Sequence, residues 1–141
     1  MSILPMSSTH LPGVAILSDQ LGYPVTENEL AHRFQKLLQS PRHAFFVYEE
    51  NKNILGWIHL ECVEDLIEDD KAEIKALIVS ENSRGNGIGK ALIESAEKWA
   101  KTYHLHTIYL NCNILRERTH TFYEREGFSN YKTSRFFEKK I

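Results

Sequence analysis

Arg84-Gly85-Asn86-Gly87-Ile88-Gly89-Lys90-Ala91 joins a predicted strand over residues 72–79 to a predicted amphipathic helix over residues 87–103. Glycine adopts positive φ without strain and lets the backbone approach a ligand closely. At the start of a helix, free amide N–H groups and the helix dipole both favour an anion. The stretch therefore predicts a phosphate-binding loop between strand and helix. A glycine-rich turn without a ligand is the alternative.

Two common phosphate-binding patterns do not fit this loop. A Walker A loop has four residues between its first Gly and its Gly-Lys-Ser/Thr end, whereas Gly85 and Gly89 enclose three, and Ala91 replaces the hydroxyl that would bind magnesium. The dinucleotide pattern G-x-G-x-x-G fails as well, because no third glycine stands at the right place after Gly87 or Gly89. A nucleotide-binding role is left only for ATP bound without magnesium chemistry.

What remains resembles the pyrophosphate-binding motif of the GNAT superfamily, the acyl-CoA-dependent N-acyltransferases. The motif R-G-x-G-I-G follows Leu77-Ile78-Val79 here. Farther along, Phe122-Tyr123-Glu124-Arg125-Glu126-Gly127-Phe128 resembles the second signature of that family, a helix that ends at a glycine. Two matches in the proper order are more specific than either alone.

The likeness covers most of the chain and is greatest to small aminoglycoside-acetyltransferase-like members. The front half contributes Leu21-Gly22-Tyr23-Pro24 and Gly56-Trp57-Ile58-His59. The resemblance implies an α+β GNAT fold, a mixed twisted sheet with splayed central parallel strands flanked by helices. It also implies one acetyltransferase domain over residues 1–141.

Length and composition agree with one globular domain. The chain has 141 residues, 42% hydrophobic and 26% charged, and a net charge of −2 with a pI near 6.4. This charge provides no general field for nucleic acid, so we expect no nucleic-acid partner. Cys62 and Cys112 lack metal or redox spacing, and we expect them to be reduced core residues of a cytoplasmic protein. No basic leader precedes an apolar stretch of membrane length, so we expect a soluble, unprocessed chain with no membrane association.

The hydrophobic pattern predicts elements in an α+β order. A first helix is expected over residues 9–21, and Thr26 with Glu29 forms a capping box that opens a second helix through residue 38. Residues 44–48 and 54–63 read as a hairpin around a turn at 50–53. Further strands are expected at 72–79, 107–113 and 135–140, and further helices at 87–103 and 117–125, with Gly127 as the C-terminal cap of the last.

By resemblance, acetyl-CoA is the cosubstrate and lies between splayed strands 72–79 and 107–113. Splaying frees backbone groups that must find partners, and the amides of pantetheine supply them. One of the strand amides is then expected to polarise the thioester carbonyl. The residues assigned to acetyl-CoA are Leu77, Ile78, Val79, Arg84, Gly85, Asn86, Gly87, Ile88, Gly89 and Lys90. This chain has Arg116 and Thr119 where many members have Asn and Ala, so Asn113, Arg116 or His120 is expected to replace the usual Asn contact.

Amine attack on a thioester requires a base and an acid. An alkylammonium has a pKa near 10.4 and must lose a proton, while the departing thiolate must be protonated or stabilised. Glu73 is the first base candidate, because alternation places it on one face of its strand with Lys75, Leu77 and Val79. The alternative for Glu73 is a surface salt-bridge residue paired with Lys75 or its neighbours.

His59 is a second base candidate, since imidazole titrates in the useful range, although such a histidine more often packs or hydrogen-bonds. Tyr123 is the acid candidate, matching the tyrosine that many family members aim at the CoA sulfur. A neutral phenol can donate a hydrogen bond to a developing thiolate. A core aromatic beside Phe122 is the alternative for Tyr123.

The acceptor is less well specified by the sequence. An acidic connection enters strand 72–79, and it favours a cationic small-molecule amine such as an aminoglycoside, a polyamine or a basic peptide end. Its residues, with Glu61 before them, are Glu64, Asp65, Glu68, Asp69 and Asp70. His104 and His106 lack a third ligand at a metal-site spacing, so no metal is expected.

Two function classes remain from the sequence. The favoured one is an N-acetyltransferase that uses acetyl-CoA in a ternary complex. The other is a catalytically quiet acyl-CoA-binding module that senses or regulates. The presence of both Glu73 and Tyr123 favours the enzyme, because a binding module needs neither. The sequence leaves the oligomeric state open, with a homodimer as one alternative.

Overall fold

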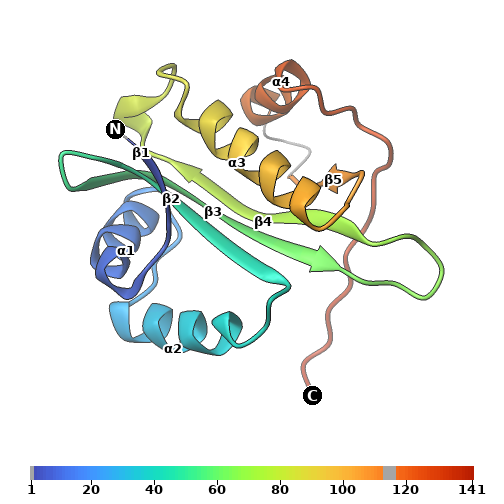
Figure 1. Ribbon diagram of the computed structural model, residues 1–141, viewed down its shortest axis with the longest axis horizontal. Coiled ribbons are helices and arrows are strands. Elements are labelled where there is room, and N and C mark those ends of the chain that lie inside the picture. The colour runs from blue at the N-terminus through green and yellow to red at the C-terminus, as the bar shows by residue number, and fades with distance from the viewer. Residues whose placement is uncertain (1, 113–116) are drawn as a thin grey trace. The chain divides into compact units, whose positions relative to one another are not determined.

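A computed structural model describes residues 2–112 and 117–141 of the chain (Figure 1). The chain forms two compact units, Met1–Leu110 and Asn111–Ile141. The elements of the first unit are β1 Ser2–Pro5, the 3₁₀ turn η1 Ser8–His10, α1 Leu11–Gln20, α2 Glu27–Leu38, β2 His43–Glu50, β3 Asn53–Val63, β4 Lys71–Val79, the 3₁₀ turn η2 Glu81–Ser83, α3 Ile88–Thr102 and β5 Ile108–Tyr109. The second unit contains α4 Glu117–Arg125.

The first unit is built on a sheet with strand order β1-β2-β3-β4-β5. Strands β1 to β4 run antiparallel to their neighbours, whereas β5 runs parallel to β4. Helices α1 and α2 cover one face of the sheet, and α3 covers the other (Figure 1). The resulting mixed α+β sheet has the architecture implied by the resemblance.

Local sequence signals explain where most elements begin and turn. Thr26 accepts a hydrogen bond from the Glu29 amide at 3.1 Å while the Glu29 carboxylate accepts one from the Thr26 amide at 3.0 Å, so the predicted capping box is confirmed. Asn51 and Lys52 both have positive φ, of 51° and 65°, as a tight two-residue hairpin turn requires. The predicted hairpin of β2 and β3 is therefore confirmed.

The core on the α3 face lies between this helix and alternate residues of β3. Gly56, Ile58, Leu60 and Cys62 are buried there. Gly56 permits the close approach of the helix, since a Cβ at this position would lie 3.0 Å from side-chain atoms of both Ile88 and Leu92. The start of α3, which follows the glycine loop, is thereby fixed against the sheet.

A β-bulge in β4 corrects the predicted face of this strand. The register pairs Ala76 with His59 and Ile74 with Leu60, which leaves Lys75 as the extra residue. Beyond the bulge, Leu77 lies opposite the buried Ile58. Because directly opposed residues share a face, Leu77 and Val79 lie on the α3 face while Glu73 lies on the other. The expectation that Glu73 shares a face with Leu77 and Val79 was wrong, since a single inserted residue reverses the alternation.

Two predicted strands differ from the observed ones, and one observed strand was not predicted. Of the strand expected at 107–113, the described part pairs only at Ile108 and Tyr109, because the ladder with β4 stops there. No strand forms at residues 135–140, where Phe136 and Phe137 are 80% and 91% exposed. Strand propensity alone does not hold such a segment without a ladder partner. Strand β1 was not predicted, because four residues carry too little periodicity.

The observed helices differ from the predicted ones at their ends. The first helix begins at Leu11 after the 3₁₀ turn, with Pro12 in its first turn, where a missing N–H costs nothing. Leu38, the last residue of α2, and Tyr103, just after α3, are 49% and 47% exposed.

The second unit ends α4 with a Schellman motif. Gly127 has a φ of 95°, its amide donates to the Glu124 carbonyl at 3.1 Å, and the Phe128 amide donates to the Tyr123 carbonyl at 3.0 Å. The rings of Tyr123 and Phe128 pack edge to face at 5.6 Å between centroids. This confirms Gly127 as the C-terminal cap and fixes Tyr123 in the last turn of the helix.

Candidate active site

The glycine loop has the backbone geometry of an anion site. Gly85 and Gly87 have positive φ of 88° and 78°, and a Cβ built on either would meet no atom within 4 Å. The Ala91 amide donates to the Gly87 carbonyl at 3.0 Å as the first intrahelical bond of α3. The amides of residues 88–90 precede that bond and so have no helical acceptor. Open space and free donors at a helix start together fit a phosphate group.

Two cations flank this loop. Arg84 and Lys90 are exposed, and within residues 2–112 and 117–141 neither takes part in an ion pair. A guanidinium or an ammonium beside the free amides would strengthen the attraction for phosphate.

Strand β4 leads from this loop to the base candidate along an open edge. On the β5 side the ladder consists of the pairs Ala72 with Ile108 and Glu73 with Tyr109, and no other described residue pairs with that edge from Ile74 onward. Glu73 therefore lies where β4 and β5 cease to pair. Val79 stands six positions after Glu73, which corresponds to about 20 Å along a strand. A ligand that reaches both ends must be long and extended, as pantetheine is.

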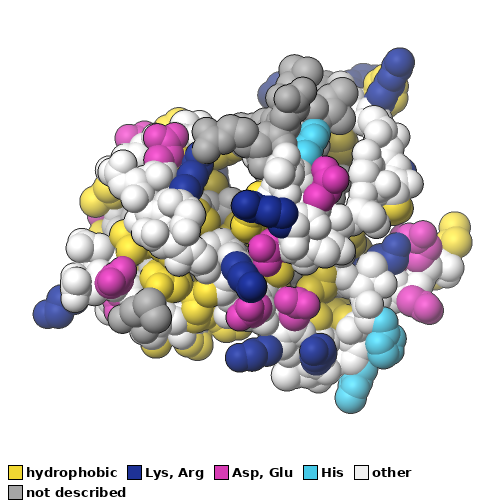
Figure 2. Space-filling model, turned by 90° about the horizontal axis from the view of Figure 1, so that it is seen from above, with side chains coloured by type: hydrophobic (Ala, Val, Ile, Leu, Met, Phe, Trp, Pro, Cys, Tyr) yellow, Lys and Arg dark blue, Asp and Glu magenta, His cyan; other side chains and the backbone are white. Residues whose placement is uncertain are grey.

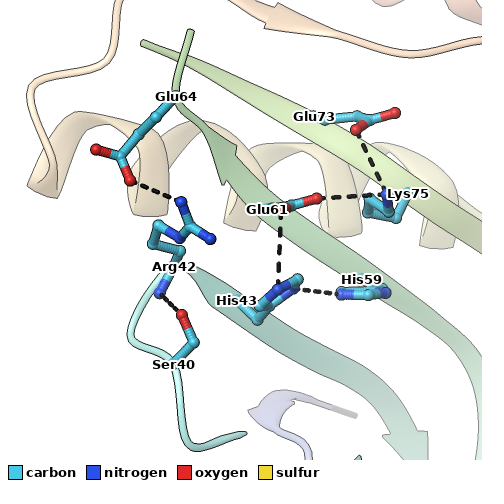
Figure 3. Close-up of polar contacts among 8 residues, drawn as sticks. All are labelled: Ser40, Arg42, His43, His59, Glu61, Glu64, Glu73 and Lys75. Carbon is cyan, nitrogen blue, oxygen red and sulfur yellow. Dashed lines mark hydrogen bonds and ion pairs between the residues drawn. The ribbon is translucent and has the colours of Figure 1, made fainter. Parts of the chain in front are cut away.

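Glu73 belongs to a group of polar side chains on the face covered by α1 and α2, which we call the charged row (Figure 3). Its members, in the order of their successive contacts, are Glu73, Lys75, Glu61, His43 and His59. The Lys75 ammonium lies 3.3 Å from a Glu61 oxygen and 3.7 Å from a Glu73 oxygen. His43 Nε2 lies 3.9 Å from the other Glu61 oxygen, and His43 Nδ1 lies 3.0 Å from His59 Nε2. The structure thus brings both base candidates, Glu73 and His59, onto one face.

His59 is the more enclosed of the two candidates. Its ring stacks on Phe45 at 4.3 Å between centroids, and its Nε2 shares a hydrogen bond with His43. Burial, with help from the nearby His43 and Lys75, lowers the pKa of His59 to about 4, so the ring is neutral at pH 7. His59, on β3, also stands opposite Ala76 of β4 and is therefore two strands away from β5. Of the two candidates, Glu73 is therefore nearer to the edge where the ladder opens.

Tyr123 lies half-buried on α4 in the second unit. Burial, together with the charge of Cys112, raises the pKa of its phenol to about 12. The phenol is therefore a hydrogen-bond donor over the whole physiological range. Its role toward the CoA sulfur stays a prediction.

Several remaining assignments also stay predictions. His120 lies on α4, whereas Asn113 and Arg116 lie outside the described residues. Trp57 donates from Nε1 to the Ser18 hydroxyl of α1 at 3.2 Å and so ties the sheet to that helix. Tyr23 is 44% exposed. For buried Cys62, burial first and nearby carboxylates next raise the pKa of the thiol, which makes it a poor nucleophile. The expectation that Cys112 lies in the core was wrong, because this residue is exposed.

Sequence reasoning missed His43 as a member of this site, whereas it placed Lys75 beside Glu73 on one strand face. The contact of His43 with Glu61 depends on strand register, which no local pattern reveals. An adjacent pair of strands that each carry a histidine is the one sequence signal that could have suggested His43.

Other kinds of site are not indicated by the described residues. Among them, no group of three or more His, Cys, Asp and Glu side chains is arranged to hold a metal ion. No helix in the described ranges is both long and apolar enough to cross a bilayer. Basic and acidic side chains are interspersed over the face shown in Figure 2, without a broad basic surface of the kind that tracks nucleic acid.

The fold, the glycine loop at the start of α3 and the open edge of β4 define the class of acyl-CoA-dependent acyltransferases. The profile of the acetyltransferase (GNAT) family matches residues 14–128, and the chain belongs to this family. An uncharacterised N-acetyltransferase of Methanocaldococcus jannaschii is 31% identical over 97 residues, which make up 67% of this chain and 43% of that protein. The chain thus spans less than half the length of that relative.

Solved structures show the same fold. The aminoglycoside 6'-N-acetyltransferase AAC(6')-Ig of Acinetobacter haemolyticus superimposes with a TM-score of 0.87 at 18% identity, covering 100% of this chain and 99% of that one. The aminoglycoside 6'-N-acetyltransferase AAC(6')-Iy, in complex with the bisubstrate analogue CoA-S-monomethyl-acetylneamine, gives a TM-score of 0.88 at 17% identity, covering 99% and 98%. The predicted GNAT fold is therefore confirmed.

The lowered pKa of His59 predicts a loss of stability in acid. The unfolded chain takes up a proton at His59 below about pH 6.5, whereas the folded chain does so only near pH 4. The contribution of neutral His59 to the free energy of unfolding is therefore fully present above pH 6.5 and is lost as the pH falls toward 4. The loss is roughly 2 kcal/mol after allowance for partial exposure. Urea unfolding at pH 7 and pH 4.5 should show a smaller difference in unfolding free energy for His59→Gln than for the wild type. The exposed His32 provides the control, since His32→Gln should leave the difference unchanged; an unchanged difference in His59→Gln would contradict the assignment.

Proposed function

We propose that this protein transfers the acetyl group of acetyl-CoA to a primary amine of a small cationic acceptor, by direct attack in a ternary complex. The observation that carries the proposal is the glycine loop, whose free amides and open space stand at the start of α3, one strand length from Glu73. Membership in the acetyltransferase family supports it.

The loop and the open edge of β4 would bind the cosubstrate. The amides of residues 88–90, with Arg84 and Lys90, would hold the pyrophosphate. The free backbone groups of residues 77–79 on the β5 side would pair with the pantetheine amides, and one of these N–H groups would polarise the thioester carbonyl. The sulfur end of an extended arm would then reach toward Glu73.

Glu73 would take the proton from the acceptor, directly or through a water molecule. It is half-buried beside the last β4–β5 pair, next to the gap in which the thioester would lie. His59 is a weaker candidate because its ring is enclosed by Phe45 and His43. The amine nitrogen then forms a bond to the acetyl carbon as the carbon–sulfur bond breaks, and the electron pair leaves with the CoA sulfur.

Tyr123 would stabilise that leaving sulfur as a hydrogen-bond donor. With a pKa of about 12, the phenol is a weaker acid than a thiol, whose pKa is about 8.5. Complete transfer of its proton to the thiolate is therefore uphill. Donation of a hydrogen bond to the developing negative charge is the role that this acidity supports.

The charge of the region favours a cationic acceptor. The charged row holds two half-buried carboxylates, Glu61 and Glu73, against one ammonium, Lys75. The connection between β3 and β4 adds the exposed carboxylates of Glu64, Asp65, Glu68, Asp69 and Asp70. A polyamine or aminoglycoside would be attracted to such a surface, and salt would weaken this attraction because exposed charges are screened. The bisubstrate analogue bound by AAC(6')-Iy contains an acetylneamine group, which supports an amine of this type.

Stabilisation by acetyl-CoA tests the role of the loop. A ligand that binds only the folded state adds about 2.7 kcal/mol at 100 times its dissociation constant. We expect acetyl-CoA to raise the thermal midpoint of the wild type, and Gly87→Val or Arg84→Glu to remove most of that gain. Valine at a φ of 78° is strained, and its side chain would occupy the space proposed for phosphate.

Gly22 offers a matched control for this measurement. It has a φ of 86° and equally open surroundings, but it lies outside the glycine loop. Gly22→Val should lower the midpoint without ligand yet keep the response to acetyl-CoA. If Gly87→Val and Arg84→Glu respond to acetyl-CoA as the wild type does, the cosubstrate binds elsewhere.

A further inference from the structure

Lys75, the unpaired residue at the β4 bulge, is a cation between two carboxylates that would otherwise repel each other. Glu61 and Glu73 are directly opposite in the β3–β4 register, an arrangement that is destabilising for like charges. Lys75, the inserted residue, lies on the same face and contacts both, at 3.3 Å and 3.7 Å. Bulges often redirect a side chain next to an active site.

We infer that Glu61 and Lys75 are positioning residues for Glu73, an inference whose catalytic consequence rests on the proposed function. Lys75 lies nearer to Glu61 than to Glu73, so Glu61 holds the ammonium partly away from the base (Figure 3). Glu73 thereby remains free to accept a proton from the acceptor. The same ammonium offsets the repulsion between the two carboxylates.

Further groups near Glu73 come from its own strand and from β5. Tyr109 of β5 is beside it in the register, and Lys71 of β4 lies over the Tyr109 ring at 5.9 Å and pairs with Glu68 at 3.8 Å. His43 of β2 lies 3.9 Å from a Glu61 oxygen and shares a hydrogen bond of 3.0 Å with His59. Within the described residues, α1 and α2 contribute no ion pair to the row.

The two substitutions that remove these neighbours should have opposite effects on Glu73. In Glu61→Gln the ammonium of Lys75 keeps Glu73 as its only carboxylate partner, which makes Glu73 harder to protonate. In Lys75→Met the negative charge of Glu61 is left uncompensated, which makes Glu73 easier to protonate. A charge within 4–6 Å shifts the titration midpoint of a carboxyl group by about one pH unit or more. Because these side chains are partly exposed, we expect a shift of about one pH unit.

Carbon-13 NMR of the glutamate side-chain carboxyls, with Glu73 assigned through Glu73→Gln, measures this without any need for activity. We expect the titration midpoint of Glu73 to fall by about one pH unit in Glu61→Gln, to rise by about as much in Lys75→Met, and to return toward the wild-type value in the double variant. Arg42→Gln, which breaks the Arg42–Glu64 ion pair of 2.7 Å outside the row, should leave the midpoint in place. Equal midpoints in all variants, or shifts of the same sign, would overturn the inference.

Activity then provides a separate readout. The acid limb of the pH profile of kcat/KM should move in the same direction as the titration midpoint of Glu73. At a fixed pH on this limb, a shift of one pH unit changes kcat/KM tenfold. In Lys75→Arg the acid limb should stay at its wild-type pH, because arginine retains the positive charge. If the ion pair has only a structural role, the acid limb should stay at the same pH in every variant. A wild type that releases no CoA with any amine would contradict the proposed function and leave the NMR test of the charged row standing.

Discussion

Replacing Glu73 with Gln should lower kcat at neutral pH by about 100-fold or more, because general-base catalysis contributes roughly that much. Glutamine keeps the shape and hydrogen-bonding reach of the side chain but cannot take a proton. The loss should be greatest at low pH, where free amine is scarce, and should diminish toward pH 10, where the acceptor is already deprotonated. Steady-state kinetics over pH 6 to 10 measures this recovery.

His59→Gln is the parallel variant that separates the two base candidates. Because the pKa of His59 is about 4, an essential His59 would produce an ionisation near pH 4 in the kcat/KM profile, not near 6.5. The expected result is that His59→Gln retains most activity at neutral pH. A large loss in His59→Gln with little loss in Glu73→Gln would reverse the assignment, and full activity in both would leave proton removal to water.

Tyr123→Phe should lower kcat by about 100-fold, with little change in the affinity for acetyl-CoA. The substitution keeps the ring that packs on Phe122 and Phe128 and deletes only the donor. Loss of one donor to a developing charge costs on this order. Binding of acetyl-CoA measured by calorimetry, beside kcat, separates the two effects.

The high pKa of the phenol adds a pH criterion for the same residue. At a pKa of about 12 the donor stays protonated, so Tyr123 should produce no basic limb below about pH 11 in the wild-type profile. If Tyr123→Phe turns over as fast as the wild type, the residue has a packing role only.

Much of the first unit was predictable because its signals are local. The strand–loop–helix around Gly85 and Gly87, the capping box at Thr26 and the turn at Asn51 each depend on a few adjacent residues whose conformational preferences agree. The same holds for Gly127 at the end of α4. Family resemblance added the prediction that β4 and β5 are parallel neighbours, which the register confirms.

The charged row could not be predicted, because it depends on two irregularities of register. A regular hairpin that closes at Asn51 and Lys52 would place His43 opposite Leu60 and on the other face from His59. The observed register pairs Tyr48 with Gly56, so that one residue of β3 is extra and His43 meets Glu61. The bulge at Lys75 likewise reverses the faces of β4. Each insertion involves a single residue with no distinctive composition.

The C-terminal segment shows the opposite failure. Its aromatic residues have high strand propensity, yet a strand exists only when a neighbouring strand accepts its hydrogen bonds. Residues 129–141 form no helix or strand in the structure. The roles of Asn113, Arg116 and His120 toward CoA and the single-domain organisation over residues 1–141 stay predictions.

Release of CoA thiol from acetyl-CoA in the presence of a panel of amines tests the central claim most directly. The panel should pair polyamines and aminoglycosides with neutral and acidic amines of similar size, at low and high salt, and mass spectrometry should identify the acetylated product. We expect release that depends on the amine, the highest kcat/KM for the polycations, and a smaller advantage for them at high salt. Binding of acetyl-CoA without amine-dependent release from any member of the panel would contradict the account and identify the protein as an acyl-CoA-binding module.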